Sequence, residues 1–173
     1  IVLSSHREEN VANTENFKNL LNILNLLNEL YNYKIVVSVH PRIRDRVENL
    51  NKKRFTKIIF CKPFSFTDYI KLQINSKMVI SDSGTINEES SILGFKAINI
   101  RNSHERPEAD EEGTSIMTGL NVLRVNQAID FFVNNKVEKK NLVEDYKHQN
   151  ISDKLVKIVM SFIGFINQNN YKK

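Results

Sequence analysis

The fold is decided by the segment MVISDSGTINEE, residues 78–89. Its first residues form an apolar run that is typical of a buried strand, and residues 86–93 carry the apolar spacing of a helix. A strand that passes through a short glycine-containing loop into a helix is the connection found in open parallel sheets. The segment therefore predicts an α/β protein in which residues 82–85 lie at the carboxyl edge of the sheet.

Short apolar runs alternate with amphipathic stretches through the first part of the chain. The predicted strands are residues 1–3, 35–39, 58–61, 78–81 and 97–100, and the predicted helices are residues 14–30, 43–52, 66–74 and 86–93. Strands that are apolar almost throughout are typical of a sheet covered on both faces. The alternation predicts a parallel sheet with right-handed crossovers and helices on both faces.

The pattern changes after residue 100. Residues 101–114 form a polar loop, an apolar pair follows at 116–117, and residues 127–133 have the spacing of a helix. Residues 134–150 are polar and resemble a linker or a charged helix exit. A last helix is predicted at 154–166, and it is so apolar that it needs a partner surface.

Composition excludes several classes of protein. The 173 residues contain 25 Lys and Arg against 20 Asp and Glu, a net charge of +5. The densest basic cluster, at residues 42–46 and 52–54, has an acidic member and helical spacing, which favour a solvated helix face over a nucleic-acid site. No window holds the roughly 18–20 uninterrupted apolar residues of a membrane span. The mild positive charge fits small phosphate ligands better than DNA. The single cysteine, Cys61, excludes an internal disulfide and fits a reducing compartment, so we expect a cytoplasmic protein.

Polar side chains follow every predicted strand. They lie at residues 4–10, 40–42, 62–64, 81–85 and 101–106. Three of the four histidines are among them: His6, His40 and His104. Because the carboxyl ends of parallel strands meet at one edge, these side chains predict one shared site.

The loop before the helix at residues 86–93 suits an anion. Gly84 lets the backbone come close to a ligand, and the free N–H groups at the start of the helix favour a diphosphate. The alternative is that Ser83 or Thr85 only caps the helix. Glu88 and Glu89 either complement the helix dipole or reach sugar hydroxyls.

His6 and Arg7 place a group that can transfer a proton or bind phosphate beside a fixed cation, unless His6 is merely structural or exposed. No His or Cys spacing supports a metal site. The five glycines form neither a dinucleotide-binding nor a Walker motif, and Ser83 lacks a nucleophile elbow. We therefore expect no metal and no cofactor.

Several motifs together resemble a known family. They are His6-Arg7-Glu8-Glu9-Asn10, His40-Pro41, Ser81-Asp82-Ser83-Gly84-Thr85-Ile86-Asn87-Glu88-Glu89, Arg101-Asn102-Ser103-His104-Glu105-Arg106-Pro107-Glu108-Ala109 and Glu112-Gly113-Thr114. In order and spacing, over residues 1 to about 133, they resemble the non-hydrolysing UDP-N-acetylglucosamine 2-epimerases. The tail after residue 150 resembles the subgroup that acts on UDP-2-acetamido-2,6-dideoxy-L-talose, for capsule or O-antigen synthesis.

The resemblance implies a fold and a reaction. The family has two Rossmann-like domains of the glycosyltransferase-B type, with the UDP-sugar between them. This chain resembles the C-terminal UDP-binding domain at residues 1–149, and residues 150–173 resemble a helix that crosses back to an absent N-terminal domain. The family inverts carbon 2 by eliminating and re-adding UDP, and its acid and base carboxylates belong to the other domain. We therefore expect a homodimer at full length and an inactive fragment.

The resemblance also implies roles for single residues. His6 corresponds to the active-site histidine, Ser83 and Gly84 to diphosphate contacts, and Glu89 to the carboxylate that holds the ribose. Tyr69 lies where an aromatic ring packs on uracil, although a helix residue facing the core is the alternative. Four further residues are expected near the site: the cations Arg7, Arg101 and Arg106, and His40, which lies near a position linked with regulation.

Two departures from the family motifs affect the substrate. Thr85 replaces the second glycine of the commoner Asp-Ser-Gly-Gly, and Glu8 replaces a common arginine. Both are compatible with the talose subgroup. Two other functions stay open: a retaining glycosyltransferase of the same architecture, and a module that binds a nucleotide-sugar without catalysis.

Overall fold

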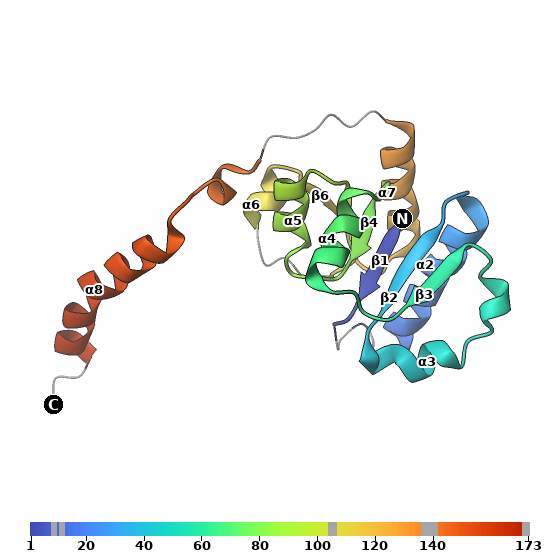
Figure 1. Cartoon of the computed structure of the whole chain (residues 1–173), viewed down its shortest axis with the longest axis horizontal. Helices are drawn as coiled ribbons and strands as arrows, with labels where there is room; N and C mark the ends of the chain where they lie inside the picture. The colour runs from blue at the N-terminus through green and yellow to red at the C-terminus, as the bar shows by residue number, and fades with distance from the viewer. Residues whose placement is uncertain (8–9, 11–12, 104–106, 136–141, 171–173) are drawn as a thin grey trace. The chain divides into compact units, whose positions relative to one another are not determined.

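The computed structural model describes residues 1–7, 10, 13–103, 107–135 and 142–170, and it contains a six-stranded parallel sheet (Figure 1). The chain divides into two compact units, Ile1–Val143 and Glu144–Lys173, and the sheet belongs to the first. Its strands are β1 (Val2–Ser5), β2 (Ile35–Val39), β3 (Ile58–Cys61), β4 (Val79–Ser81), β5 (Ala97–Asn99) and β6 (Ser115–Met117). Their order is β3-β2-β1-β4-β5-β6, which confirms the predicted α/β fold.

The sixth strand, β6, was expected only as a short apolar pair. It is an edge strand that pairs with β5 alone among the described strands, and all three of its residues are half-buried. Such a strand lacks the continuous apolar run that marks the covered strands. The prediction of the sheet was therefore one strand short, while the predicted ranges of the other five differ from the observed ones by at most two residues.

The helices of the first unit lie where the sequence predicted them, with three corrections, the first being that the helix predicted at 127–133 begins at Val122. They are α2 (Thr14–Leu30), α3 (Arg44–Glu48), α4 (Phe66–Ile74), α5 (Ile86–Leu93), α6 (Pro107–Glu111) and α7 (Val122–Asn134). The predicted helix at 43–52 is a short α3 between the 3-10 turns Pro41–Ile43 and Lys52–Arg54. The segment 101–114, predicted to be a polar loop, contains α6. This helix has only five residues, too few to leave a periodic pattern in the sequence.

Capping residues explain two of the helix ends that the sequence predicted correctly. Asn13 precedes α2, and its side chain accepts hydrogen bonds from the backbone of Glu15 and Asn16. Gly94 follows α5 with φ 73°, in the left-handed region where a residue without a Cβ is favoured. The start of α5, which matters for the site, is capped differently and is described below.

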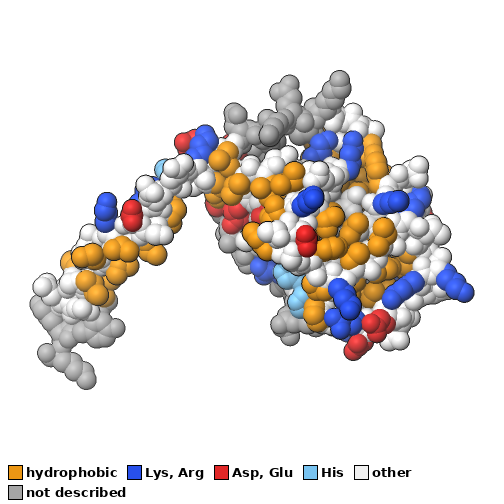
Figure 2. Space-filling model, viewed as in Figure 1, with side chains coloured by type: hydrophobic (Ala, Val, Ile, Leu, Met, Phe, Trp, Pro, Cys, Tyr) orange, Lys and Arg blue, Asp and Glu red, His pale blue; other side chains and the backbone are white. Residues whose placement is uncertain are grey.

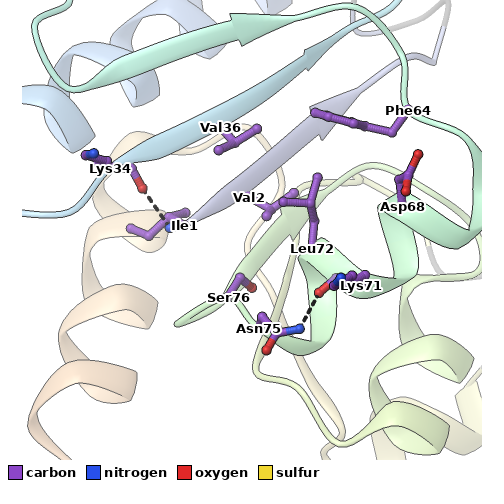
Figure 3. A pocket seen from close by; sticks show the side chains of 10 residues that line it. All are labelled: Ile1, Val2, Lys34, Val36, Phe64, Asp68, Lys71, Leu72, Asn75 and Ser76. Carbon is purple, nitrogen blue, oxygen red and sulfur yellow. Dashed lines mark hydrogen bonds between the residues drawn. The ribbon is translucent and has the colours of Figure 1, made fainter.

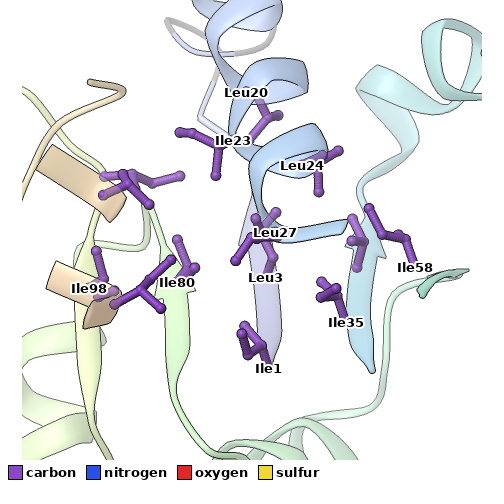
Figure 4. Close-up of a cluster of buried hydrophobic side chains, with 14 of the residues drawn as sticks. Ile1, Leu3, Leu20, Ile23, Leu24, Leu27, Ile35, Ile58, Ile80 and Ile98 are labelled. Carbon is purple, nitrogen blue, oxygen red and sulfur yellow. The ribbon is translucent and has the colours of Figure 1, made fainter. Parts of the chain in front are cut away.

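The core lies mainly between the sheet and the helices α2 and α7. Leu24 and Leu27 of α2 pack over Leu3, Ile80 and other strand residues, and all of these are almost fully buried (Figure 4). A second, smaller cluster on the opposite face holds Val2, Val79, Ile86, Phe95 and Ala97, with side chains of α4 and α5 against it. Neighbouring strand residues point to opposite faces, so Val2 and Leu3 belong to different layers.

The second unit consists of the 3-10 turn Glu144–Tyr146 and the helix α8 (Ile151–Asn170). Its apolar side chains are exposed, among them Phe162 at 53% and Met160 at 71%. Figure 2 shows hydrophobic side chains on the surface of this helix. A helix with this many exposed apolar side chains normally covers another surface. None of the described helices is long and apolar enough to cross a membrane.

Candidate functional site

The carboxyl edge of the sheet is organised by the buried carboxylate of Asp82, which directly follows β4. This side chain is fully buried and accepts hydrogen bonds from Ser5 Oγ at 2.7 Å and Asn10 Nδ2 at 3.0 Å. It also accepts from the backbone N–H groups of His6 at 3.0 Å and Arg7 at 3.1 Å. Because β1 and β4 are neighbours, one carboxylate ties the loop after β1 to the loop after β4.

His6 and His40 come together at this edge. The exits of β1 and β2 are adjacent, and the two imidazole rings lie 6.1 Å apart between centroids. Nδ1 of His6 lies 3.3 Å from Oδ1 of Asp82, and the His6 side chain is 43% exposed while the carboxylate is buried. The ring is thus open to a ligand on one side and faces a buried negative charge on the other.

Backbone N–H groups and hydroxyls at the start of α5 lie next to Asp82 and bond to one another. Ser83 donates its N–H to Ser81 Oγ at 3.0 Å, and its own hydroxyl accepts from the N–H of Thr85 at 3.3 Å. Thr85 is the N-cap residue, but its side chain makes no capping hydrogen bond. Ser83 thus satisfies one amide, as the capping alternative predicted, and Gly84 lies half-buried between these two side chains.

Glu89, one turn into α5, is held by two short hydrogen bonds. Thr85 Oγ1 donates to its Oε1 at 2.6 Å, and Gln73 Nε2 donates to its Oε2 at 2.6 Å. Gln73 comes from α4 and is only 1% exposed. The sequence reasoning did not identify Gln73; the available signal was an amide between two apolar residues, Leu72 and Ile74, in the last turn of an amphipathic helix.

Tyr69 of α4 lies partly buried against the smaller apolar cluster. Burial is the largest cause of a raised pKa for its phenol. The charges of Glu89 and Asp82 raise this pKa further, whereas hydrogen bonds with Ser4 and Ser81 lower it. The Tyr69 hydroxyl thus lies close to Ser4 of β1 and Ser81 of β4, while its ring packs against the core, as expected for the alternative that this residue faces the core.

The arginines expected near the site differ in their surroundings. Arg101 follows β5 and is only 2% exposed, with Nη2 3.2 Å from Ser103 Oγ, so this cation lies inside the protein. Arg7 is half-buried beside His6, and its backbone is bound to Asp82. Arg106 lies outside the described residues, as do His104 and Glu105.

A buried amide, Asn87, links α5 to the elements that follow it. It is 4% exposed, its Oδ1 accepts from Ser115 Oγ at 2.8 Å, and its Nδ2 donates to Asp110 Oδ1 at 3.3 Å. These bonds connect α5 to β6 and α6. The sequence reasoning gave Asn87 no separate role.

An apolar groove of about 620 Å³ lies at the opposite edge of the sheet (Figure 3). Ile1 and Lys34, at the amino ends of β1 and β2, line it together with Val36 and with Phe64 and Leu72 near α4. Phe64 is the one residue of this groove that also follows a strand, because it comes after the end of β3. The described residues contain no group of three or more His, Cys, Asp or Glu side chains that could hold a metal ion.

Comparison with known proteins gives a consistent result. The family model for UDP-N-acetylglucosamine 2-epimerase matches residues 1–160. A curated relative of that name from Methanocaldococcus jannaschii is 33% identical over 144 residues, which is 81% of this chain and 39% of the relative.

Two solved structures match the whole fold. UDP-N-acetylglucosamine 2-epimerase from Rickettsia bellii is 41% identical with a TM-score of 0.82, over 99% of this chain and 47% of its own. The Methanocaldococcus jannaschii enzyme in complex with UDP-GlcNAc and UDP is 31% identical with a TM-score of 0.78, over 92% of this chain and 44% of its own. The chain therefore spans less than half the length of these proteins.

Proposed function

We propose that this chain, which belongs to the UDP-N-acetylglucosamine 2-epimerase family, supplies the UDP-binding half of an enzyme that inverts carbon 2 of a UDP-N-acetylhexosamine. The observation that carries the proposal is the junction at Asp82. One buried carboxylate holds the His6 loop directly beside the start of α5. A proton-transfer group and an anion site therefore share one edge, as the departure of a diphosphate requires.

The proposed UDP site runs along the start of α5. The N–H groups and hydroxyls around Ser83 and Gly84 bind the diphosphate, and the helix dipole adds to the attraction. Glu89 binds the ribose hydroxyls. Its two oxygens each accept one short hydrogen bond, and a carboxylate has about four acceptor sites, so capacity for two ribose hydroxyls remains.

The contact proposed between Tyr69 and uracil involves less of the ring than full stacking would. Its ring packs against the apolar cluster, so only the part that stays exposed could meet the base. Arg101 is too buried to contact a ligand as it stands, and we assign it to supporting the loop after β5. Arg7 and Arg106 stay proposed as cations near the phosphates, and His40 as a neighbour of His6.

The reaction places defined demands on these residues. The bond between carbon 1 and the β-phosphate oxygen breaks, and its electron pair leaves with UDP. A base removes the proton from carbon 2, and a double bond forms between carbons 1 and 2. UDP then re-adds to carbon 1, and a proton returns to the opposite face of carbon 2. The charge that develops on the leaving diphosphate is stabilised by the α5 amides, with His6 and Arg7 beside them.

A second half of the protein completes the proposed enzyme. It supplies the acid and base carboxylates at carbon 2 and closes the cleft, in the glycosyltransferase-B type arrangement. The exposed apolar face of α8 is proposed to pack on that half, which would account for side chains such as Phe162. We also propose a homodimer at full length and a role in capsule or O-antigen synthesis. A 6-deoxy-talose substrate is a finer proposal that rests on Thr85 and on the tail after residue 150.

UDP titration of this chain tests the site. Isothermal titration calorimetry should detect UDP, with weaker binding by Ser83→Ala and Glu89→Gln. Removing one hydrogen bond to a charged partner costs about 1.5–3 kcal/mol, or roughly 10–150-fold in Kd. Glu29→Gln, an exposed carboxylate at the end of α2, is the matched control and should bind like the unmodified chain. Absence of UDP binding in the unmodified chain would contradict the site.

The reaction itself is tested on the whole protein that carries this chain. Incubation with a UDP-N-acetylhexosamine in heavy water should place deuterium at carbon 2, because the proton leaves and returns from solvent. A retaining glycosyltransferase or a binding module leaves the proton at carbon 2 in place. The chain alone should produce no exchange, because it lacks the proposed carboxylates.

A further inference from the structure

The side chain of Asp82 makes more contacts than a structural link between two loops needs. Its Oδ2 atom accepts from Ser5 Oγ, Arg7 N and Asn10 Nδ2 at 2.7, 3.1 and 3.0 Å. Its Oδ1 atom accepts from the backbone N–H of His6 at 3.0 Å and lies 3.3 Å from Nδ1 of the same residue. The same backbone N–H also lies 3.2 Å from Oδ2, so both oxygens anchor the loop, and Oδ1 is the one that faces the imidazole.

We propose that Asp82 is a positioning residue that fixes the tautomer and orientation of His6. This proposal rests on the function proposed above, in which His6 lies beside the leaving diphosphate. A carboxylate that is ionised only accepts hydrogen bonds, so a hydrogen on the nitrogen 3.3 Å from Oδ1 is favoured over a lone pair at that position. Nδ1 of His6 is therefore protonated, and Nε2 keeps its lone pair.

The anchoring explains why this arrangement is rigid. Three donors from three different residues hold Oδ2, so the carboxylate group cannot rotate without breaking them. The group is also fully buried, which strengthens each of these interactions relative to water. The His6 side chain is 43% exposed, and Nε2 is the ring nitrogen that does not face Asp82, so we assign to it the exchange of a proton with a ligand.

The arrangement has a chemical consequence for the reaction. When Nε2 takes up a proton, the imidazolium that forms lies between the buried negative charge and the diphosphate site. Asp82 directly precedes Ser83, so the residue that orients His6 is also covalently joined to the start of α5. A change at Asp82 therefore alters the tautomer of His6 without removing any side chain that contacts the ligand.

Asp82→Asn tests the proposal because it exchanges one acceptor for a donor at nearly constant shape. Ser5, Arg7 and Asn10 require the amide oxygen at the Oδ2 position, and the backbone N–H of His6, which is 3.2 Å from Oδ2, can bond there as well. The NH2 group therefore takes the position that faces Nδ1 of His6. Nδ1 must then accept, and the hydrogen moves to Nε2. Long-range proton–nitrogen NMR on this chain, above the pH at which histidines are charged, reports which nitrogen is protonated.

The expected result is Nδ1–H for His6 in the unmodified chain and Nε2–H in Asp82→Asn. The His6 signals are assigned with His6→Gln. The control is Asp130→Asn, which should leave the tautomer of His6 unchanged. Asp130 is another carboxylate that accepts a side-chain hydrogen bond, from Tyr31 just after the end of α2. Finding Nε2–H in the unmodified chain overturns the proposal, even if Asp82→Asn does not fold. An unchanged tautomer in a folded Asp82→Asn chain overturns it as well.

The tautomer measurement and the UDP titration fail separately. If the unmodified chain shows Nδ1–H but does not bind UDP, the proposed function fails while the geometry of the pair stands. If UDP binds and His6 carries its hydrogen on Nε2, the positioning role fails while the binding function stands. A purely structural role for Asp82 would lower stability in Asp82→Asn but would leave the tautomer unchanged.

Discussion

Replacing the buried amide of α4, Gln73→Leu, should weaken UDP binding without destabilising the fold. Nε2 of this side chain donates to Glu89 at 2.6 Å, whereas its Oε1 is buried and has no hydrogen-bond partner among the described residues. A buried acceptor without a partner costs about 1–3 kcal/mol. The amide therefore serves the carboxylate at a cost to its own helix.

The two effects of Gln73→Leu can be estimated from these contacts. Leucine has a similar volume and no polar atom, so the cost of the unpartnered Oε1 disappears. Glu89 is half-buried and keeps its bond from Thr85, so water can replace the lost donor. The free energy of unfolding should therefore stay within about 1 kcal/mol of the unmodified value. Glu89 loses one of its two fixed bonds, and UDP affinity should fall by about 1–2 kcal/mol, or roughly 5–30-fold.

Denaturant unfolding and calorimetric UDP titration measure the two quantities on the same sample. Gln127→Leu, at an exposed position of α7, is the matched control and should change neither by much. A Gln73→Leu chain that loses more than about 2 kcal/mol of stability, yet binds UDP unchanged, would refute the reasoning. The amide would then serve the fold, and Glu89 would not depend on it.

Two further predictions concern the fold that supports the site. Tyr31 donates its hydroxyl toward Asp130 at 2.7 Å and Asn126 at 2.8 Å, so Tyr31→Phe should cost about 1–2 kcal/mol in denaturant unfolding. Burial, and then the hydrogen bond to Asp130 and its charge, raise the pKa of Tyr31 above its ordinary value. The folded state therefore favours the protonated phenol, and the free energy of unfolding should fall as the pH rises above about 10, the pKa of tyrosine in an unfolded chain. Tyr31→Phe should remove this fall at high pH. Gly119 has φ 61°, and a Cβ there would lie 2.4 Å from Asn102 Oδ1, so Gly119→Ala should cost at least about 1 kcal/mol, whereas the exposed Gly164→Ala, with nothing within 4 Å, should not destabilise. An unchanged melting temperature for Gly119→Ala would contradict this account of the loop.

The sequence predicted the fold well where one physical signal dominated. The range predicted for α2 agrees with the observed Thr14–Leu30, because its apolar spacing is long and Asn13 caps it. The short elements were harder: α6 and β6 bury too little apolar surface to leave a periodic pattern. Their positions depend instead on tertiary bonds such as Ser115 to Asn87, which no local pattern contains.

The site was predictable as a set of strand exits but not as a network. The topology of a parallel sheet is sufficient to bring His6, His40 and Ser83 to one edge, and the structure has them there. Which side chain would organise that edge was not predictable, because it depends on the spatial order β2-β1-β4 rather than on the order of the strands in the chain. Asp82 is 72 residues from Asn10 and 77 from Ser5, so its role exists only once β4 lies beside β1. Asp82 is part of the motif at residues 81–89, but nothing in the local sequence distinguishes it from the other polar residues of that loop. A buried carboxylate with donors from four neighbours is the physical reason why that position would tolerate few other side chains.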